Sequence, residues 1–253
     1  MDDYVVLSRS GGVGIITLNR PSASAFWSTS VARQIVLALN AIEFDDSLRA
    51  VVLTVAGPPS RSRKVSKNQH PDGHKSAAHE EWDGLYEALC RFKKPRVAAI
   101  NTIAAGSAFQ VALLCDIRIA HARALMGMPG WVSGVSGLNG AVVEQDRFTK
   151  IAANGHIRSD NLISAETCLQ LGLINQIVAE DDLIVEASML AQNLAAAPHD
   201  DSSLPKSRLW ELSSKGFRAR IELSKRAYEK AYRSAKPAKA LESLLEARAS
   251  RAL

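Results

Sequence analysis

Residues 95–130, PRVAAINTIAAGSAFQVALLCDIRIAHARALMGMPG, constrain the fold of this chain more than any other stretch. Their pattern predicts a strand at 96–100, a turn of small residues, a short buried helix at 107–114, a strand at 117–120 and a second turn. A strand that leads into the start of a helix presents backbone N–H groups, which favour a negatively charged oxygen. The stretch therefore predicts a site that polarises such an oxygen.

The N-terminal part of the chain predicts an α/β fold with a partly parallel sheet. Strands are expected at 4–8 and 13–19 around a hairpin turn at Gly11 and Gly12, followed by an amphipathic helix at 30–44. The continuous apolar run at 50–55 is typical of a strand buried on both faces. A helix between two such strands predicts a crossover connection. Residues 56–78 are polar, basic and rich in turn formers, which predicts a long loop.

The remaining pattern predicts a mainly helical second half. Helices are expected at 80–92, 141–153, 164–171, 181–197 and over most of 217–251, with a short strand at 173–178. We interpret residues 1–197 as one core domain and 198–253 as a C-terminal helical region. A chain of 253 residues with 47% hydrophobic content suits one sizeable domain of this kind.

Composition narrows the classes of function. No apolar run approaches the ~20 residues of a membrane span, and the start of the chain has no export signal, so a cytoplasmic protein without membrane contact is expected. Cys90, Cys115 and Cys168 lack metal-ligand spacing and are interpreted as reduced, buried thiols. The net charge of +5 fits either solvated basic faces or a phosphate-bearing ligand. Aromatic and basic residues are not interleaved, so nucleic acid is not an expected partner.

Four segments resemble the crotonase (enoyl-CoA hydratase/isomerase) superfamily, and the resemblance covers nearly the whole chain. They are GVGIITLNRP at 12–21, LRAVVLTVAG at 48–57, KPRVAAINTIAAGSAFQVALLCDIRIA at 94–120 and ISAETCLQLGLINQIV at 163–178. The resemblance implies a spiral of ββα turns with a C-terminal helical region, assembled as a homotrimer or a hexamer. It also implies an acyl-CoA thioester ligand, with coenzyme A as part of the substrate and no separate cofactor or metal.

In this superfamily two backbone N–H groups polarise the thioester carbonyl, and the resemblance places them at Ser107 and Ser62. Ser107 follows Gly106 where the superfamily prefers glycine, so its hydroxyl is expected to occupy ligand space. The turn at Ser62 carries Arg63 and Lys64 in place of small residues. This basic cluster either meets the phosphates of coenzyme A or is solvated.

The two glutamates of the superfamily's hydratases fall where this chain has Gln110 and Gly130. Hydration needs a group that activates water and a group that delivers a proton. An amide does not titrate and glycine has no side chain, so hydration by the usual pair is not expected. Asn139 is a candidate for orienting water or a carbonyl by hydrogen bonding, or is a turn residue before Gly140.

The resemblance also implies a set of substrate-binding residues, each of which has an alternative in ordinary packing or at the surface. These are Ala25, Trp27, Arg63, Lys64, Gly106, Trp131 and Lys225. His121, directly after the strand at 117–120, is interpreted as a surface residue that points away from the ligand.

Three functions stay open at this point. The first is an enzyme that acts on acyl-CoA thioesters with atypical chemistry, and the intact 94–120 segment favours it. The second is a catalytically inactive acyl-CoA-binding or assembly homologue, favoured by the loss of both glutamates and of the small-residue turn at Ser62. The third is a hydrolase of C–C bonds in β-diketones that works without coenzyme A, suggested by Trp27 alone.

Overall fold

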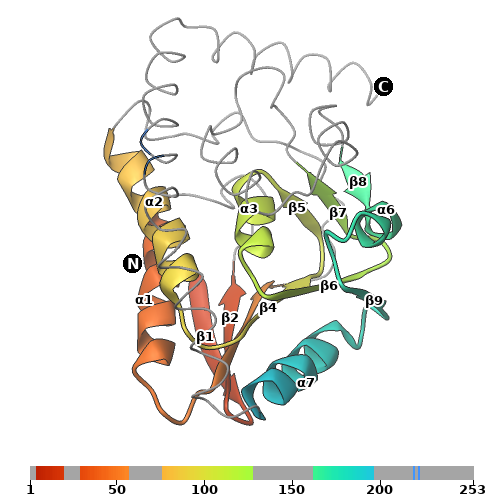
Figure 1. Cartoon of the computed structure of the whole chain (residues 1–253), viewed down its shortest axis with the longest axis horizontal. Coiled ribbons are helices and arrows are strands. Elements are labelled where there is room, and N and C mark those ends of the chain that lie inside the picture. The colour runs from red at the N-terminus through yellow and green to blue at the C-terminus, as the bar shows by residue number, and fades with distance from the viewer. Residues whose placement is uncertain are drawn as a thin grey trace, which may run out of the picture.

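The computed structural model describes residues 4–19, 29–56, 76–127 and 162–196, together with Ala219 and Glu222. Within these residues, six strands form one sheet in the order β1-β2-β3-β4-β6-β9, and three form a second in the order β5-β7-β8 (Figure 1). The strands of the large sheet are β1 Val5–Ser10, β2 Val13–Leu18, β3 Ala50–Val55, β4 Arg96–Ile100, β6 Ile117–His121 and β9 Gln176–Val178. The strands of the small sheet are β5 Ile103–Ala105, β7 Leu125–Gly127 and β8 Ile163–Ser164. The helices are α1 Thr29–Glu43, α2 Ser76–Arg91, α3 Ser107–Leu113, α6 Ala165–Gln170 and α7 Leu183–Ala196.

The large sheet begins with a hairpin and continues as a parallel sheet. β1 and β2 are antiparallel, and Ser10 pairs with Val13 across a two-residue turn. The turn consists of Gly11 and Gly12, whose φ angles are +53° and +80°, a conformation that glycine adopts without strain. From β2 to β9 every pairing is parallel. Because α1 connects β2 to its parallel neighbour β3, the predicted crossover is confirmed.

The large sheet carries a hydrophobic core on each face. Val51 and Leu53 of β3 belong to the cluster that α1, α2 and α3 cover, and the alternate residues Ala50 and Val52 belong to the cluster under α7. This alternation follows from the two-residue period of a strand. The expectation that the run at 50–55 is buried on both faces is therefore confirmed. In Figure 1, α1 and α2 lie on one side of the sheet and α7 on the other.

The small sheet was not predicted. The sequence indicated turns where β5 and β7 occur, yet Ala105 of β5 pairs with Gly127 of β7 in a parallel ladder. Strands of two or three residues are too short to show the alternation by which a strand is recognised. As a result β4, β5 and α3 form one ββα turn, and β6 and β7 begin the next.

The predicted start of α6 is confirmed, whereas the strand that follows it is shorter than predicted. The Ser164 hydroxyl accepts a hydrogen bond from the Thr167 N–H at 3.2 Å and so caps the helix. Gly172, with a φ angle of +71°, follows its end. The strand expected at 173–178 is only Gln176–Val178. The predicted helix at 141–153 lies outside the described residues, as does all but Ala219 and Glu222 of the helix at 217–251.

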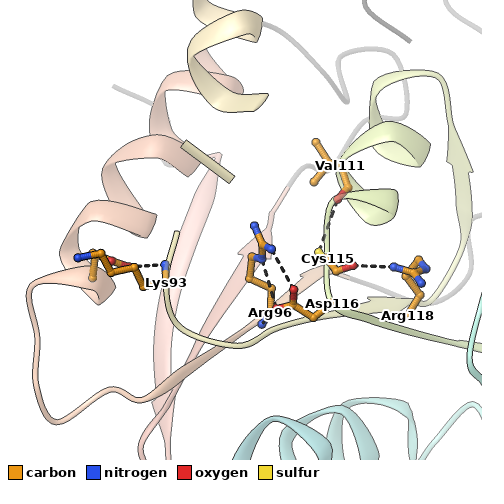
Figure 2. A network of polar contacts seen from close by, with 7 residues as sticks. Lys93, Arg96, Val111, Cys115, Asp116 and Arg118 are labelled. Carbon is orange, nitrogen blue, oxygen red and sulfur yellow. Dashed lines mark hydrogen bonds and ion pairs between the residues drawn. The ribbon is translucent and has the colours of Figure 1, made fainter. Parts of the chain in front are cut away.

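Side chains and carbonyl groups fix the C-terminal end of α3 against β6 (Figure 2). Arg118 Nη1 donates to the Cys115 carbonyl oxygen at 2.6 Å, and its Nε donates to the Leu173 carbonyl oxygen at 2.7 Å. The Cys115 thiol donates to the Val111 carbonyl oxygen at 3.5 Å. These contacts satisfy carbonyl groups near the end of α3 and hold the helix in place over the sheet.

Candidate functional site

The N-terminal end of α3 is positioned by the small sheet. β5 delivers the chain to Gly106, whose N–H donates to the Gly127 carbonyl oxygen at the end of β7, at 3.0 Å. Gly106 precedes α3 with φ +61° and ψ −123°, a conformation open to glycine and strained for other residues. The turn therefore sets the direction in which Ser107, the first residue of α3, presents its backbone N–H. The first N–H groups of a helix have no partner within the helix.

Gln110 lies one turn after Ser107, on the same side of α3. Its side chain is buried, with an exposed fraction of 2%. The Tyr86 hydroxyl, from α2, donates a hydrogen bond to Gln110 Oε1. Two neutral side chains from two helices, Tyr86 and Gln110, therefore meet at the position where the sequence resemblance places one of the missing glutamates.

Tyr86 is held as a neutral phenol. Burial raises the pKa of Tyr86 above its usual range; the nearby Ser107 side chain acts in the opposite direction, and the charge of Asp83 acts in the same direction as burial. The ring is packed in the main core and lies 6.2 Å, between centroids, from the ring of Trp82. Tyr86 therefore acts as a hydrogen-bonding hydroxyl and does not exchange its proton near neutral pH.

A small apolar cavity of about 60 Å³ lies against another side of α3. Ala108, Val111 and Ala112 of the helix line it together with residues of β2, β3, β4 and β5. Ser107 and Gln110 are not among its described lining residues. The cavity is therefore separate from the polar group formed with Tyr86.

His121 is a buried residue, so its interpretation as a surface residue was wrong. Its exposed fraction is 2%, because it is the last residue of β6, inside the large sheet. Nδ1 accepts a hydrogen bond from the Arg123 N–H at 3.1 Å, which leaves Nε2 to donate to the Asn101 carbonyl oxygen at 2.9 Å. Both ring nitrogens thus form hydrogen bonds with the backbone, and the side chain stabilises the structure at the end of β6.

The structure brings together only part of the set that the sequence predicted. Gly106, Ser107 and Gln110 are described and adjacent. The other candidates lie outside the described residues: Ala25, Trp27, Ser62, Arg63, Lys64, Gly130, Trp131, Asn139 and Lys225.

Metal-binding clusters and membrane-spanning helices are both absent from the part of the chain that the structure describes. No group of three or more His, Cys, Asp or Glu residues there is arranged to hold a metal ion. None of the described helices has the length and apolar character needed to cross a membrane.

Sequence reasoning missed Tyr86, although a signal was present. Leu85, Tyr86, Leu89 and Phe92 have the spacing of one helix face and are all buried. A tyrosine on such a face needs a hydrogen-bond partner for its hydroxyl. The pattern did not reveal that this partner is Gln110, because the contact joins two helices.

Comparison with known proteins identifies a family and a fold. Residues 8–251 match the family model described as enoyl-CoA hydratase/isomerase. The chain is 28% identical to the short-chain-enoyl-CoA hydratase of Clostridium acetobutylicum over 198 residues. This matched region covers 76% of this chain and 75% of the hydratase. The chain is 29% identical over 222 residues to 4-chlorobenzoyl coenzyme A dehalogenase-2 of an Arthrobacter species, covering 84% and 80%. Identity to the (E)-benzylidenesuccinyl-CoA hydratase of Thauera aromatica is 30% over 196 residues, covering 76% and 77%.

Solved structures confirm the fold. The human mitochondrial delta3-delta2-enoyl-CoA isomerase superposes with a TM-score of 0.83 at 21% identity, covering 98% of this chain and 99% of the isomerase. An enoyl-CoA hydratase/isomerase from Pseudoalteromonas atlantica T6c gives the same TM-score at 19% identity, covering 96% and 97%. The two mixed sheets described above are thus the α/β fold that the sequence resemblance predicted.

Proposed function

Because the chain belongs to the enoyl-CoA hydratase/isomerase family, we propose that it binds an acyl-CoA thioester and polarises its carbonyl group. The names of three relatives support this choice of ligand. They specify a short-chain enoyl, a 4-chlorobenzoyl and a benzylidenesuccinyl group, each joined to coenzyme A. The acyl group differs among these relatives, whereas coenzyme A is common to all three. We therefore propose a thioester of coenzyme A as the ligand, without a particular acyl group.

The observation that most supports this proposal is the geometry at the start of α3. The Ser107 N–H is the first of the helix, and the turn at Gly106 fixes its direction. A rigid backbone donor of this kind stabilises negative charge that develops on a carbonyl oxygen, and loss of one such donor costs roughly 2.7–4 kcal/mol in a well-studied enzyme. We propose the Ser62 N–H as the second donor.

The chemistry that follows polarisation is proposed to be atypical. Gln110 is neutral and its carboxamide oxygen accepts from Tyr86, so it does not supply a proton or remove one. Gly130 has no side chain to do so. A reaction that needs carbonyl polarisation without this pair fits, with Asn139 proposed to orient water or a carbonyl. The same neutrality of Gln110 favours the second candidate, an inactive acyl-CoA-binding or assembly homologue.

The remaining proposed roles concern binding and assembly. Coenzyme A phosphates are proposed to meet Arg63, Lys64 and Lys225, and the acyl group to lie near Gly106. Ala25, Trp27 and Trp131 are proposed to line the rest of the ligand site. We propose a homotrimer or hexamer, which light scattering coupled to size-exclusion chromatography measures directly.

A pair of variants at one position tests carbonyl polarisation. Ser107→Pro removes the N–H at the first helical position, where proline is well tolerated, and Ser107→Ala keeps it. The probe is 4-dimethylaminocinnamoyl-CoA, whose absorption moves to longer wavelength when its carbonyl is polarised. We expect the shift with the wild-type protein and with Ser107→Ala, and its loss with Ser107→Pro. An equal shift with both variants would contradict the role of this N–H.

Two further assays separate the candidate functions. Titration with coenzyme A tests the ligand class, and absence of affinity for it and for the probe would overturn the proposal in favour of a reaction without coenzyme A. Hydration of crotonyl-CoA, followed by the loss of its conjugated absorption, is expected to be far slower than in an ordinary hydratase. Turnover at an ordinary rate would show that another acid or base replaces the missing glutamates.

A further inference from the structure

The strands β3 and β4 separate from one another at their carboxyl ends. Their parallel pairing ends at Leu53 and Ala98, although both strands continue beyond this point. Each strand stays paired with its other neighbour, since Val55 pairs with β2 and Ile100 pairs with β6. The separation therefore lies between β3 and β4, and not between either strand and its other neighbour.

Side-chain hydrogen bonds stand where the next backbone bonds of this ladder would come. The spacing of a parallel ladder would place those bonds from the Val55 N–H to the Ala99 carbonyl oxygen and from the Asn101 N–H to the Val55 carbonyl oxygen. In the structure, the buried Thr54 hydroxyl donates to the Ala99 carbonyl oxygen at 3.0 Å. Asn101 Nδ2 donates to the Val55 carbonyl oxygen. The two strands are thus joined through side chains where their backbones are no longer paired.

Asn101 is also held from the other side of β4. His121, at the end of β6, donates from Nε2 to the Asn101 carbonyl oxygen at 2.9 Å. Asn101 lies at the corner where the chain leaves the large sheet after β4 and enters β5 of the small sheet. Its side chain therefore binds the end of β3 while its backbone is bound to the end of β6, and both bonds hold this corner in place.

The two separated strands lead to the two backbone donors proposed for the site. From β4 the chain passes through Asn101 and β5 to Ser107, and from β3 it continues toward Ser62. Two N–H groups polarise one carbonyl oxygen only if both point at it from about 3 Å. Paired strands lie about 4.8 Å apart, so a separation of their ends is needed to leave room for a ligand atom between the segments that follow. The width of that separation must then be fixed.

The apolar cavity of about 60 Å³ shows that the separated ends leave space. Its lining includes Thr54 and Val55 of β3, together with Ile100 and Asn101 at the end of β4. Ala108, the second residue of α3, also lines it. The space therefore extends from the separated strand ends to the first turn of α3.

We propose that Asn101, together with Thr54, is a positioning residue of the acyl-CoA site: the two side chains hold the separated ends of β3 and β4 at the spacing at which both N–H donors converge on one carbonyl oxygen. The inference rests on the proposed function for its ligand, and on the described hydrogen bonds for its geometry. Asn101 acts through the backbone that it holds and does not need to contact the ligand.

The first test needs no ligand and follows amide hydrogen exchange by NMR. In Asn101→Ala, the amides of Ala56 and Gly106 should exchange about tenfold faster relative to that of Val51. Ala56 directly follows β3 and Gly106 follows β5, so both lie beyond the separated ends, whereas the Val51 N–H donates to the Pro95 carbonyl oxygen at 2.9 Å in the paired part. Equal acceleration of all three amides, or none, would show that Asn101 does not hold the strand ends and would overturn the proposal.

Asn175→Ala is the matched control for this measurement. The Asn175 side chain also joins two segments of the large sheet, because its Oδ1 accepts from the Arg118 N–H of β6 at 2.9 Å. It lies directly before β9, on the side of β6 that faces away from β4. We expect no preferential acceleration at Ala56 and Gly106 in this variant.

The second test measures polarisation at saturating 4-dimethylaminocinnamoyl-CoA, so that a change of affinity does not enter. Asn101→Ala should lose about half or more of the absorption shift of the bound probe, while affinity for coenzyme A stays within about twofold. Thr54→Val removes the other side-chain bond and should lose a smaller part of the shift. Thr54→Ser keeps the hydroxyl and should restore it. A full shift in Asn101→Ala, or an equal shift in both Thr54 variants, contradicts positioning.

The outcomes keep the two proposals apart. If the wild-type protein binds neither coenzyme A nor the probe, the proposed function fails, and the exchange measurement alone decides whether Asn101 holds the strand ends. If Asn101→Ala does not fold, Thr54→Val replaces it in both measurements, with Thr54→Ser as its control. Identical exchange and identical probe shift in these two variants would then overturn the proposal.

Discussion

Arg96, buried at the start of β4, places its Nη2 2.9 Å from Asp116 Oδ1 in the connection between α3 and β6. The backbone N–H of Arg96 also donates to Asp116 Oδ2 at 2.8 Å, so one carboxylate joins two neighbouring strands (Figure 2). Burial opposes the charged guanidinium, and the attraction and hydrogen bond of Asp116 outweigh it, so the pKa of Arg96 is raised.

The two partners differ in exposure, and this predicts unequal effects of removing them. The side chain of Arg96 is 3% exposed and that of Asp116 is 27% exposed. Asp116→Asn leaves a buried cation without its counter-charge and should lower the free energy of unfolding by about 3 kcal/mol. Arg96→Met leaves a carboxylate that water reaches and should cost about half as much. Urea denaturation measures both, and an equal or reversed order would show that burial of Arg96 does not set the cost.

The raised pKa of Tyr86 predicts that the free energy of unfolding decreases at alkaline pH. An unfolded tyrosine titrates at a pKa of about 10, and the pKa of Tyr86 in the folded protein lies above that value. Between these two pKa values the folded state keeps a proton that the unfolded state has lost. The contribution of Tyr86 is therefore complete below pH ~10 and declines above it, by up to about 1.4 kcal/mol per pH unit.

Denaturation of the wild type and of Tyr86→Phe from pH 8 to above pH 10 measures this contribution. The variant should have the lower stability at pH 8 and a shallower decline above pH ~10. The difference between two proteins is needed because Cys168 acts in the same direction. Burial, and next the charge of Glu166, raise the pKa of its thiol to about 12. Parallel curves for the two proteins would contradict the raised pKa of Tyr86.

The sequence predicted the parts of this fold that local pattern controls. The run at 50–55 could be assigned because both of its faces are apolar, and Ser164 could be assigned as a helix start because a cap is a local contact. The small sheet could not be, since β5, β7 and β8 are defined by their partners rather than by their own composition. For the same reason Gln110 was recognised as a departure from the family, while the hydroxyl that holds it was not.

The three cysteines predict a simple pattern of chemical labelling. Cys90 is partly exposed, whereas Cys115 and Cys168 are fully buried and none forms a disulfide. The thiolate is the reactive form, and the pKa of Cys168 near 12 keeps that residue protonated. Iodoacetamide at pH 8 should therefore label Cys90 in the folded protein, and all three thiols only in denaturant.

Mass spectrometry of the peptides locates each label. Cys90→Ser is the matched control and should leave the folded protein almost unlabelled. Labelling of Cys168 in the folded protein at the rate of Cys90 would show that α6 opens readily from the core.

Gly106 and Gly84 form a matched pair of glycines that predicts opposite effects of the same substitution. A Cβ atom added at either position would meet no atom within 4 Å, so neither alanine creates a clash. Gly106 has a φ angle of +61° and a ψ angle of −123°, which an alanine adopts only with strain, so Gly106→Ala should lower stability by about 1–3 kcal/mol. Gly84 lies within α2 without a positive φ angle, and Gly84→Ala should raise stability by up to about 1 kcal/mol.

Thermal denaturation of both variants measures whether stability falls in Gly106→Ala and rises in Gly84→Ala. Affinity for 4-dimethylaminocinnamoyl-CoA should fall in Gly106→Ala alone, because this turn directs the Ser107 N–H, and should stay unchanged in Gly84→Ala. If Gly106→Ala were as stable as the wild type, its backbone would have another conformation than the one described. If it were destabilised yet bound and polarised the probe normally, the direction of the Ser107 N–H would not depend on this glycine.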